Sequence, residues 1–128
     1  MKISKTTPIL SVDNIEASLP FWTDVLGYEK TMEVPHNGRL GFVILVKDGL
    51  ELMLQTHASI RDDLPQIADY FRPGSICLYS DVDSIDAAAA TLKDTQVIVP
   101  LRTTPYGAQE IWVRNRDGNI LGFAQFKS

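Results

Sequence analysis

The spacing of hydrophobic and polar positions changes along the chain and predicts two β-hairpins. In GRLGFVILVKDGLELMLQ, residues 38–55, two β-rich runs stand on either side of Lys47-Asp48-Gly49. Asp-Gly between such runs is a strong signal for a hairpin turn. EIWVRNRDGNILGFAQF, residues 110–126, repeats the arrangement around Asp117-Gly118. One hairpin is therefore expected near the middle of the chain and one near its end.

Two other segments have helical patterns. In NIEASLPFWTDVLG the apolar residues, Trp22 among them, recur on one helical face, so Trp22 is expected in the core. Asp13 stands where it would cap this helix. Pro20 removes a backbone donor inside the helix, so we expect a kink or a late start. The alanine-rich SIDAAAATLK favours a second helix, with Asp83 as its expected cap.

The same order of elements occurs twice, which indicates an internal duplication. Val12-Asp13 recurs as Val82-Asp83, 70 residues later, and the hairpin glycine Gly38 recurs as Gly107, 69 residues later. Each copy reads strand, helix, strand, hairpin. We therefore predict an α+β fold of two tandem βαβββ modules in one domain. The predicted parts are a first module, 1–57, a linker with a short helix, 58–73, and a second module, 74–128.

Strand alternation assigns the side chains of each module to two faces of its sheet. The parity expected beneath the helices comprises Leu50, Leu52, Leu54, Leu78, Val82, Ile111 and Val113. The opposite parity mixes aromatic residues and methionine with carboxylates and amides, a mixture typical of a ligand cavity. The predicted ligand-binding residues are Glu51, Met53, Gln55, Cys77, Tyr79, Glu110, Trp112 and Arg114, with Tyr106 at the cavity rim.

Several of these residues have a structural interpretation as well as a functional one. Glu110 could recognise a ligand, or it could form an ion pair with Arg102 or Arg114. Trp112 and Tyr79 could stack on a planar ligand or pack in the core. The sequence leaves these alternatives open.

Composition narrows the classes of partner. The net charge is −4 and the acids are scattered, so the basic face that nucleic-acid binding needs is not expected. No apolar run approaches the ~20 residues of a membrane span, and the N-terminus lacks an apolar signal core. We therefore expect a cytoplasmic protein with no nucleic-acid or membrane partner. The single cysteine, Cys77, excludes an internal disulfide and is expected to be a small buried residue.

Together these motifs resemble the vicinal oxygen chelate superfamily of glyoxalase I, extradiol dioxygenases, fosfomycin-resistance enzymes and bleomycin-resistance proteins. ASLPFWTDVLGYEK resembles the first helix of that family. YGAQEIWVRNRDGNILGF resembles its last hairpin, with Asn115-Arg116 in place of the usual Asp-Pro. The resemblance covers nearly the whole chain. It implies two modules that form a half-barrel cavity, and a homodimer.

The resemblance also implies where a metal would bind. Metal-using members carry four ligands, usually His, Glu or Gln. The corresponding positions here are Thr7, Glu51, Cys77 and Gly122. Only Glu51 matches, and a catalytic divalent metal normally takes at least three protein ligands. We therefore expect no metal and no cofactor. A new site around Gln55 and His57, with Cys77 or Glu110, is the alternative, and His36 is expected at the surface.

Three possible functions follow from this resemblance. The preferred hypothesis is metal-independent binding and sequestration of a small organic, antibiotic-like ligand, partly aromatic and cationic, as in bleomycin-resistance proteins. The competing hypothesis is an enzyme, namely a lyase, isomerase or ring-cleaving dioxygenase with a non-standard metal site. A binding or regulatory component without turnover is a third possibility.

Overall fold

The protein is described by a computed structural model over residues 1–127; Ser128, the last residue of the predicted second module, lies outside the described residues. The chain divides into two compact units. The first unit is Pro8–Ile76, and the second combines Met1–Thr7 with the chain from Cys77 onward. Strands and a few short helices alternate in both, which confirms the α+β class.

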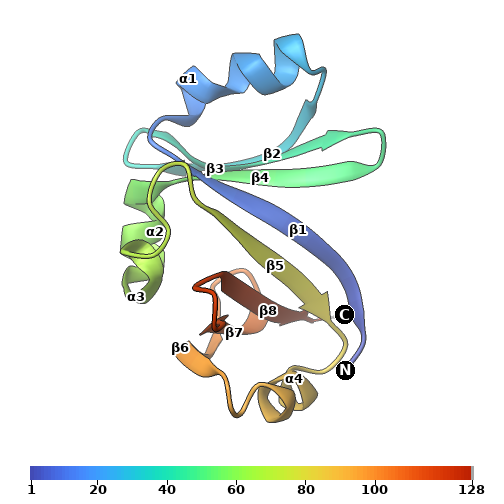
Figure 1. Ribbon diagram of the computed structural model, residues 1–128. Helices are drawn as coiled ribbons and strands as arrows, with labels where there is room; N and C mark the ends of the chain where they lie inside the picture. The colour runs from blue at the N-terminus through green and yellow to red at the C-terminus, as the bar shows by residue number, and fades with distance from the viewer. Residues whose placement is uncertain (128) are drawn as a thin grey trace. The chain divides into compact units, whose positions relative to one another are not determined.

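The first unit is built on the strand order β2-β3-β4-β1, with β1 parallel to β4 and the others antiparallel (Figure 1). Its elements are β1 (Ile3–Val12), α1 (Ile15–Pro20), a π-helical turn η1 (Phe21–Val25), β2 (Glu29–His36), β3 (Arg39–Lys47), β4 (Leu50–Thr56), α2 (His57–Asp63) and α3 (Pro65–Ala68). Residues of β1 up to Thr7 belong to the second unit.

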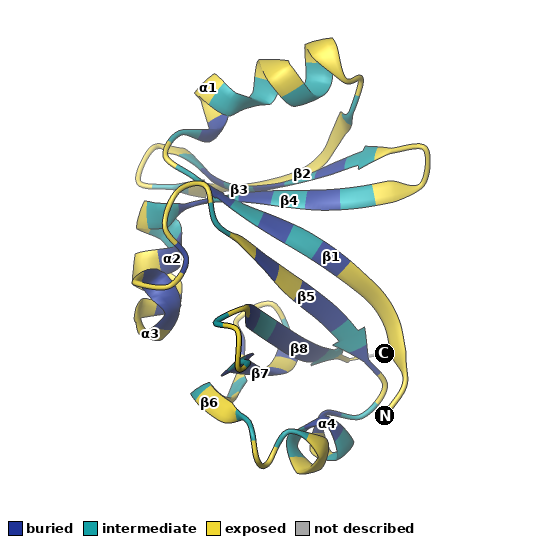
Figure 2. Ribbon diagram, viewed as in Figure 1, coloured by how far each residue is buried: buried dark blue, intermediate teal, exposed yellow. Residues whose placement is uncertain are grey.

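The core of the first unit lies between α1 and one face of its sheet. The buried residues there are Ile15, Val43, Leu45, Leu52 and Leu54, and Trp22 packs against them as predicted. Figure 2 shows buried and half-buried residues alternating along β4, as expected for a sheet with one covered face. Leu50 is an exception to the predicted face, because it sits beside the hairpin turn and is 67% exposed.

The second unit repeats this plan with the order β5-β8-β7-β6, in which β5 and β8 are parallel. Its elements are β5 (Ile76–Val82), α4 (Ile85–Thr91), β6 (Gln96–Thr103), β7 (Ala108–Arg114) and β8 (Ile120–Phe126). The core beneath α4 contains Val82, Ile85, Ala88, Ile111, Val113 and Phe123. Leu78 was expected there, but it is 41% exposed. Strand β6 is the edge strand of this unit, as β2 is of the first.

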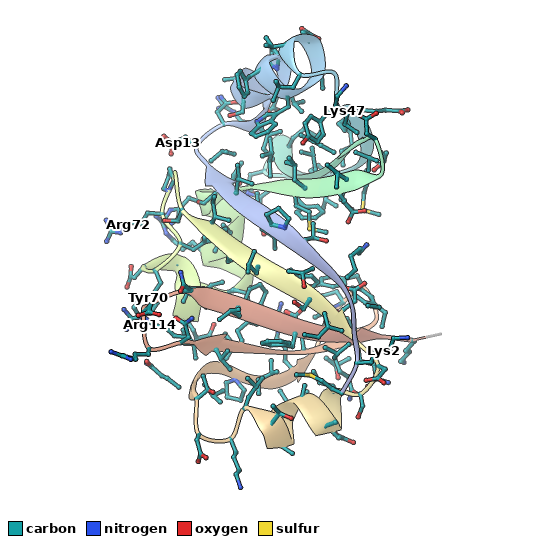
Figure 3. All side chains as sticks on the ribbon, turned by 45° about the vertical axis from the view of Figure 1, so that its right-hand side comes forward. Lys2, Asp13, Lys47, Tyr70, Arg72 and Arg114 are labelled. Carbon is teal, nitrogen blue, oxygen red and sulfur yellow. The ribbon has the colours of Figure 1, made fainter. Side chains whose placement is uncertain are left out.

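Both helix caps lie one residue beyond the predicted aspartates. Asn14 caps α1 and Ser84 caps α4, with side chains that accept hydrogen bonds from Ala17 N and Ala87 N. Asp83 instead accepts a hydrogen bond from the backbone N–H of Lys2, which Figure 3 labels near the start of β1. The two caps have nearly the same backbone angles, φ −147° and −145° with ψ 110°, as expected of a duplication.

The predicted hairpin and linker also have defined forms. Asp48 and Gly49 have φ of +51° and +78°, the left-handed pair that a tight two-residue hairpin turn needs. Pro20 ends α1, and the backbone continues as the π-helical turn η1. The helix begins at Ile15, so the late start that Pro20 suggested is wrong. The linker forms two short helices, α2 and α3, rather than one. Within residues 1–127 no helix is long and apolar enough to cross a membrane.

Candidate ligand-binding site

The second unit buries one carboxylate completely. Glu110 is 0% exposed and lies in the middle of β7, opposite Arg102 on β6 and Ala124 on β8. Strand alternation turns it to the face of the sheet opposite α4, as the sequence predicted, because Ile111 and Val113 face the helix. A buried charge is costly unless it is paired and hydrogen-bonded, so its partners determine whether it is stable there.

Five hydrogen bonds converge on this carboxylate. Its Oε1 accepts from Arg102 Nε and Nη2, at 3.0 and 2.8 Å, and from Trp112 Nε1 at 2.9 Å. Its Oε2 accepts from the hydroxyl groups of Tyr79 at 2.6 Å and Tyr106 at 2.9 Å. We call these five residues, Tyr79, Arg102, Tyr106, Glu110 and Trp112, the Glu110 cluster. The ion pair with Arg102 that the sequence left open is present.

The charge of Glu110 also affects a neighbouring phenol. Burial, and then the negative charge of Glu110, raise the pKa of Tyr79 well above its ordinary value. The Tyr79 hydroxyl therefore stays protonated and keeps donating to the carboxylate. Arg102, whose side chain is 23% exposed, supplies the compensating positive charge. The cluster is thus charge-balanced, with donors on both carboxylate oxygens.

A row of three residues next to Glu110 explains why position 122 is a glycine. Gly122 on β8 lies between its register partners Tyr79 on β5 and Trp112 on β7. The rings of Tyr79 and Trp112 are 5.5 Å apart at an angle of 38°. A Cβ atom at position 122 would lie 2.8 Å from two carbons of the Trp112 indole, closer than real Cβ contacts. The indole thus fills the space above Gly122, where family resemblance places the fourth metal ligand.

The other metal-ligand positions fit a cation no better. Thr7 and Cys77 are each 1% exposed, and burial raises the pKa of the Cys77 thiol to about 12, so no thiolate forms at neutral pH. Glu51 on β4 is half-buried, and Met53, the next residue on the same face, pairs with Ile9 and Ile44. Within residues 1–127 no three His, Cys, Asp or Glu side chains lie together so as to hold a metal ion. The residues present therefore do not match the superfamily's metal centre.

The alternative metal site around Gln55 and His57 is not formed by the described residues. His57 is the first residue of α2 rather than part of β4, because Thr56 caps the helix. Its Nε2 bonds to the carbonyl of Ala68 at 2.8 Å, and its Nδ1 to Arg61 at 3.1 Å. Gln55 Nε2 donates to Ser59 Oγ at 3.2 Å.

The second histidine is also engaged within the first unit. His36 is partly buried rather than simply at the surface, and its Nε2 lies 2.7 Å from Asp62 Oδ2.

The structure brings together only some of the predicted binding residues. Tyr79, Tyr106, Glu110 and Trp112 form one cluster, and Cys77 lies two residues before Tyr79 on β5. Glu51, Met53 and Gln55 lie half-buried on β4 in the first unit. Arg114 ends β7, near the β7–β8 turn (Figure 3).

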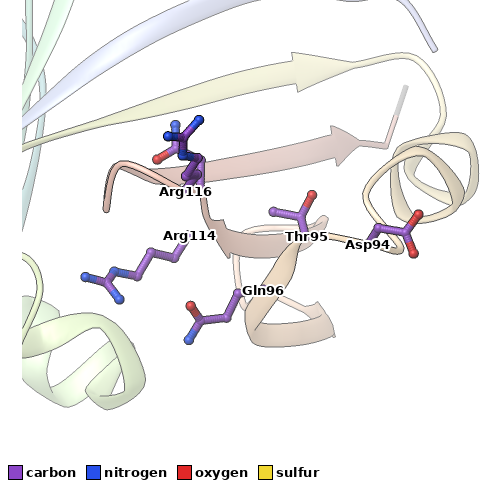
Figure 4. A pocket seen from close by; sticks show the side chains of 6 residues that line it. Asp94, Thr95, Gln96, Arg114 and Arg116 are labelled. Atoms are coloured by element: carbon purple, nitrogen blue, oxygen red, sulfur yellow. The ribbon is translucent and has the colours of Figure 1, made fainter.

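Arg114 lines a separate open cavity of about 480 Å³. Its other lining residues are Asp94, Thr95, Gln96, Asn115 and Arg116 (Figure 4). In Figure 4 Arg114 and Gln96 extend to the same side, while Asp94 is directed away from them. This polar hollow lies among turns and contains no residue of the Glu110 cluster.

The sequence pattern assigned no binding role to Arg102, which belongs to the Glu110 cluster, or to Phe126, which borders it. Arg102 was expected only as a possible ion-pair partner of Glu110, and no role was expected for Phe126. The ring of Phe126 lies 6.3 Å from that of Tyr106 and 6.5 Å from that of Tyr79. Pairing β6 with β7 around the TPYG turn would have placed Arg102 opposite Glu110. Tyr106 and Phe126 are 56% and 44% exposed, so they form the open edge of the cluster.

Comparison with known proteins identifies the class. The sequence pattern of the Glyoxalase/Bleomycin resistance protein/Dioxygenase superfamily matches residues 2–123, and the chain belongs to this superfamily. No functionally curated protein shows significant sequence similarity to it.

Solved structures share the fold at low sequence identity. A superfamily member from Vibrio splendidus 12B01 is 22% identical, with a TM-score of 0.73 over 97% of this chain and 99% of that one. Methylmalonyl-CoA epimerase from Mycobacterium tuberculosis is 15% identical, with a TM-score of 0.72 over 98% and 90%. A 2,3-dioxygenase from Pseudomonas sp. KL28 is 12% identical, with a TM-score of 0.62 over 95% and 42%. At such identities these likenesses show the fold alone.

Proposed function

We propose that the protein binds a small organic molecule at the Glu110 cluster without a metal ion, as bleomycin-resistance proteins do. The observation that carries the proposal is a buried carboxylate surrounded by aromatic hydrogen-bond donors, with an edge that reaches solvent at Tyr106 and Phe126. Binding sites for small molecules combine apolar and aromatic walls with a few placed polar groups in this way. The exposed rings supply stacking surface, and the carboxylate supplies directionality.

The choice of binding over metal-dependent catalysis rests on the residues at the ligand positions. Trp112 fills the space above Gly122, and the Cys77 thiol is buried and protonated. A lone carboxylate at Glu51 cannot hold a catalytic divalent ion by itself.

The remaining parts of the proposal rest on the family resemblance and on the composition of the chain. We propose an antibiotic-like ligand, a homodimer and a cytoplasmic location, with neither nucleic acid nor membrane as a partner.

Tryptophan fluorescence provides a direct test. The chain has two tryptophans, and Trp22 belongs to the core of the first unit. Trp22→Phe leaves Trp112 as a single reporter inside the cluster. Titration of this variant with a panel of aromatic antibiotics and related small molecules should show saturable quenching for at least one class. A panel that changes neither the fluorescence nor the thermal unfolding temperature would contradict the proposal, since a bound ligand raises apparent stability.

Metal content separates this proposal from the enzymatic alternative. Elemental analysis of the purified protein should find well under one equivalent of Zn, Ni, Mn or Fe per chain, and a chelator should leave ligand affinity unchanged. One equivalent of metal, with binding lost on its removal, would support a metal-dependent enzyme instead.

A further inference from the structure

The hydrogen bonds of Glu110 limit how a ligand can reach it. Three donors occupy Oε1 and two hydroxyl groups occupy Oε2. A carboxylate oxygen has about two acceptor positions, so both oxygens are filled. A ligand that bonds directly to Glu110 must therefore replace a donor that the protein supplies.

Tyr106 is the donor that can leave. Tyr79 and Trp112 are 7% and 3% exposed and are fixed on strands beside Gly122, while Arg102 balances the charge of the carboxylate. Tyr106 is 56% exposed and lies between β6 and β7. Exposed side chains change rotamer within picoseconds to nanoseconds, so its departure needs no movement of a strand.

The turn that carries Tyr106 is held independently of the Tyr106 side chain. Gly107 N donates to Thr104 O at 3.2 Å, and Ala108 N donates to Thr104 Oγ1 at 2.9 Å. Gly107 has φ of +85°, a conformation that glycine adopts without strain. The backbone can therefore keep its course when the phenol swings away from Glu110.

The contacts of the Tyr106 side chain indicate which ligand could take its place once it moves away. Its hydroxyl donates to Glu110 Oε2, and its ring lies beside Phe126 at 6.3 Å and 32°. Both contacts are those that an aromatic ligand with a hydroxyl group would make. In the folded protein the Tyr106 side chain occupies this place as an internal phenol.

Charge selects among such ligands. The Arg102 guanidinium already neutralises Glu110 at 2.8 Å, so an ammonium group would place a second positive charge beside Arg102. A phenolate would be repelled by the carboxylate. A neutral hydroxyl donor keeps the cluster balanced.

From these contacts we infer that the protein binds neutral phenolic molecules, whose hydroxyl group replaces that of Tyr106 on Glu110 and whose ring packs on Phe126. This inference rests on the proposed function and specifies its ligand class. It replaces the cationic ligand that the sequence suggested. A single hydroxyl is sufficient, and no metal takes part.

The test uses p-cresol, which is the tyrosine side chain as a free molecule, on the full chain with Trp112 as reporter. Tyr106→Ala removes the internal competitor, so p-cresol should bind this variant at least tenfold more tightly than the Tyr106-containing protein. Toluene, which lacks the hydroxyl, should bind the variant at least tenfold more weakly than p-cresol. Benzylamine, a cationic ring, should bind no better than toluene. Tyr70→Ala, a change at a 43% exposed tyrosine of the first unit, is the matched control and should leave p-cresol affinity unchanged.

Tyr106→Phe keeps the test decisive if the alanine variant does not fold. It retains the ring and loses the hydrogen bond, so p-cresol affinity should still rise. Equal affinity of p-cresol for the parent and both variants, or equal affinity of p-cresol and toluene, would overturn the inference. If a non-phenolic molecule quenches Trp112 while p-cresol shows no preference for the variants, the inference fails and the proposed function stands.

Discussion

The two copies of the βαβββ repeat fill the same three-residue row with different chemistry. In the first unit the register neighbours on β1, β4 and β3 are Ile9, Met53 and Ile44. In the second unit the corresponding neighbours on β5, β8 and β7 are Tyr79, Gly122 and Trp112. The first row has one side chain of moderate size on each strand. The second has two large rings on the outer strands and nothing on the central one.

The next row along the strands differs more. In the first unit it is Ser11, Gln55 and Phe42, and in the second it is Asp81, Ala124 and Glu110. The two copies pair their strands in the same order, and the place in this row that Phe42 holds on β3 is held on β7 by the buried carboxylate of Glu110. The hydrogen-bonding chemistry of the second unit therefore has no counterpart in this row of the first. Single substitutions can test each element of that difference.

Removing the Glu110 carboxylate should have the largest effect on the free energy of unfolding. Glu110→Ala leaves Arg102, two phenols and an indole N–H without their shared acceptor, and breaking a buried ion pair costs about 3–5 kcal/mol. Urea denaturation should show this loss in the free energy of unfolding. Gln109→Ala, at the exposed neighbouring residue on β7, should change stability by no more than about 0.5 kcal/mol. Equal effects of the two changes would mean that the cluster contributes nothing specific.

Adding one methyl group at Gly122, between Tyr79 and Trp112, should have the next largest effect on the free energy of unfolding. The Cβ of Gly122→Ala would lie 2.8 Å from the Trp112 indole, and overpacking of this kind costs about 1–3 kcal/mol. Met53→Leu, at the corresponding position of the first unit, conserves volume and should cost less than about 1.5 kcal/mol. Denaturation of both variants gives the comparison. If Gly122→Ala is neutral, the indole moves aside easily and the two rows are not functionally different.

The residues that the sequence predicted well are those governed by local periodicity. Leu52, Leu54, Ile111 and Val113 face the helices as strand alternation requires, and Asp48-Gly49 makes the predicted turn. Leu50 broke the pattern because it is the first residue of β4, and the adjacent turn exposes it regardless of its parity.

The site was harder to predict because it depends on pairing between strands. Glu110 and Trp112 could be recognised as inward-facing from alternation alone. That Arg102 stands opposite Glu110 depends on the register of β6 with β7, which the turn at residues 104–107 sets. Alternation within one strand does not give such a pairing. For the same reason Gly122 looked like a lost ligand position, although it also makes room for an indole.

Alkaline pH should lower the free energy of unfolding through the buried thiol of Cys77 on β5. The corresponding residue of the first copy is Thr7. The pKa of Cys77 is about 12 in the folded protein and near 9.0 for an ordinary thiol, so the stabilisation is present below pH 9 and is lost as the pH rises toward 12. At pH 10 the unfolded thiol is ionised and the folded one is not, which costs about 1.4 kcal/mol. Cys77→Ala should lack this loss.

The measurement is the free energy of unfolding of both proteins at pH 8, 10 and 11. Tyr79, whose pKa is also raised, contributes its own alkaline loss to both, so the difference between the two proteins isolates the thiol. A difference that stays constant across this range would show that Cys77 ionises as readily in the folded protein as in the unfolded chain.

The smallest effect is expected at the open edge of the Glu110 cluster. Tyr106→Phe removes the hydrogen bond to Glu110 from a residue that is 56% exposed, and water can take the place of the hydroxyl, so the cost should be about 0.5 kcal/mol. Tyr79→Phe removes the matching hydrogen bond from a residue that is 7% exposed, where water cannot replace it, and should cost two to three times as much. Unfolding curves of the two variants compare the same chemical change at the closed and open sides of one carboxylate. A larger loss for Tyr106 would mean that its phenol is a fixed structural donor, and a ligand could then not displace it cheaply.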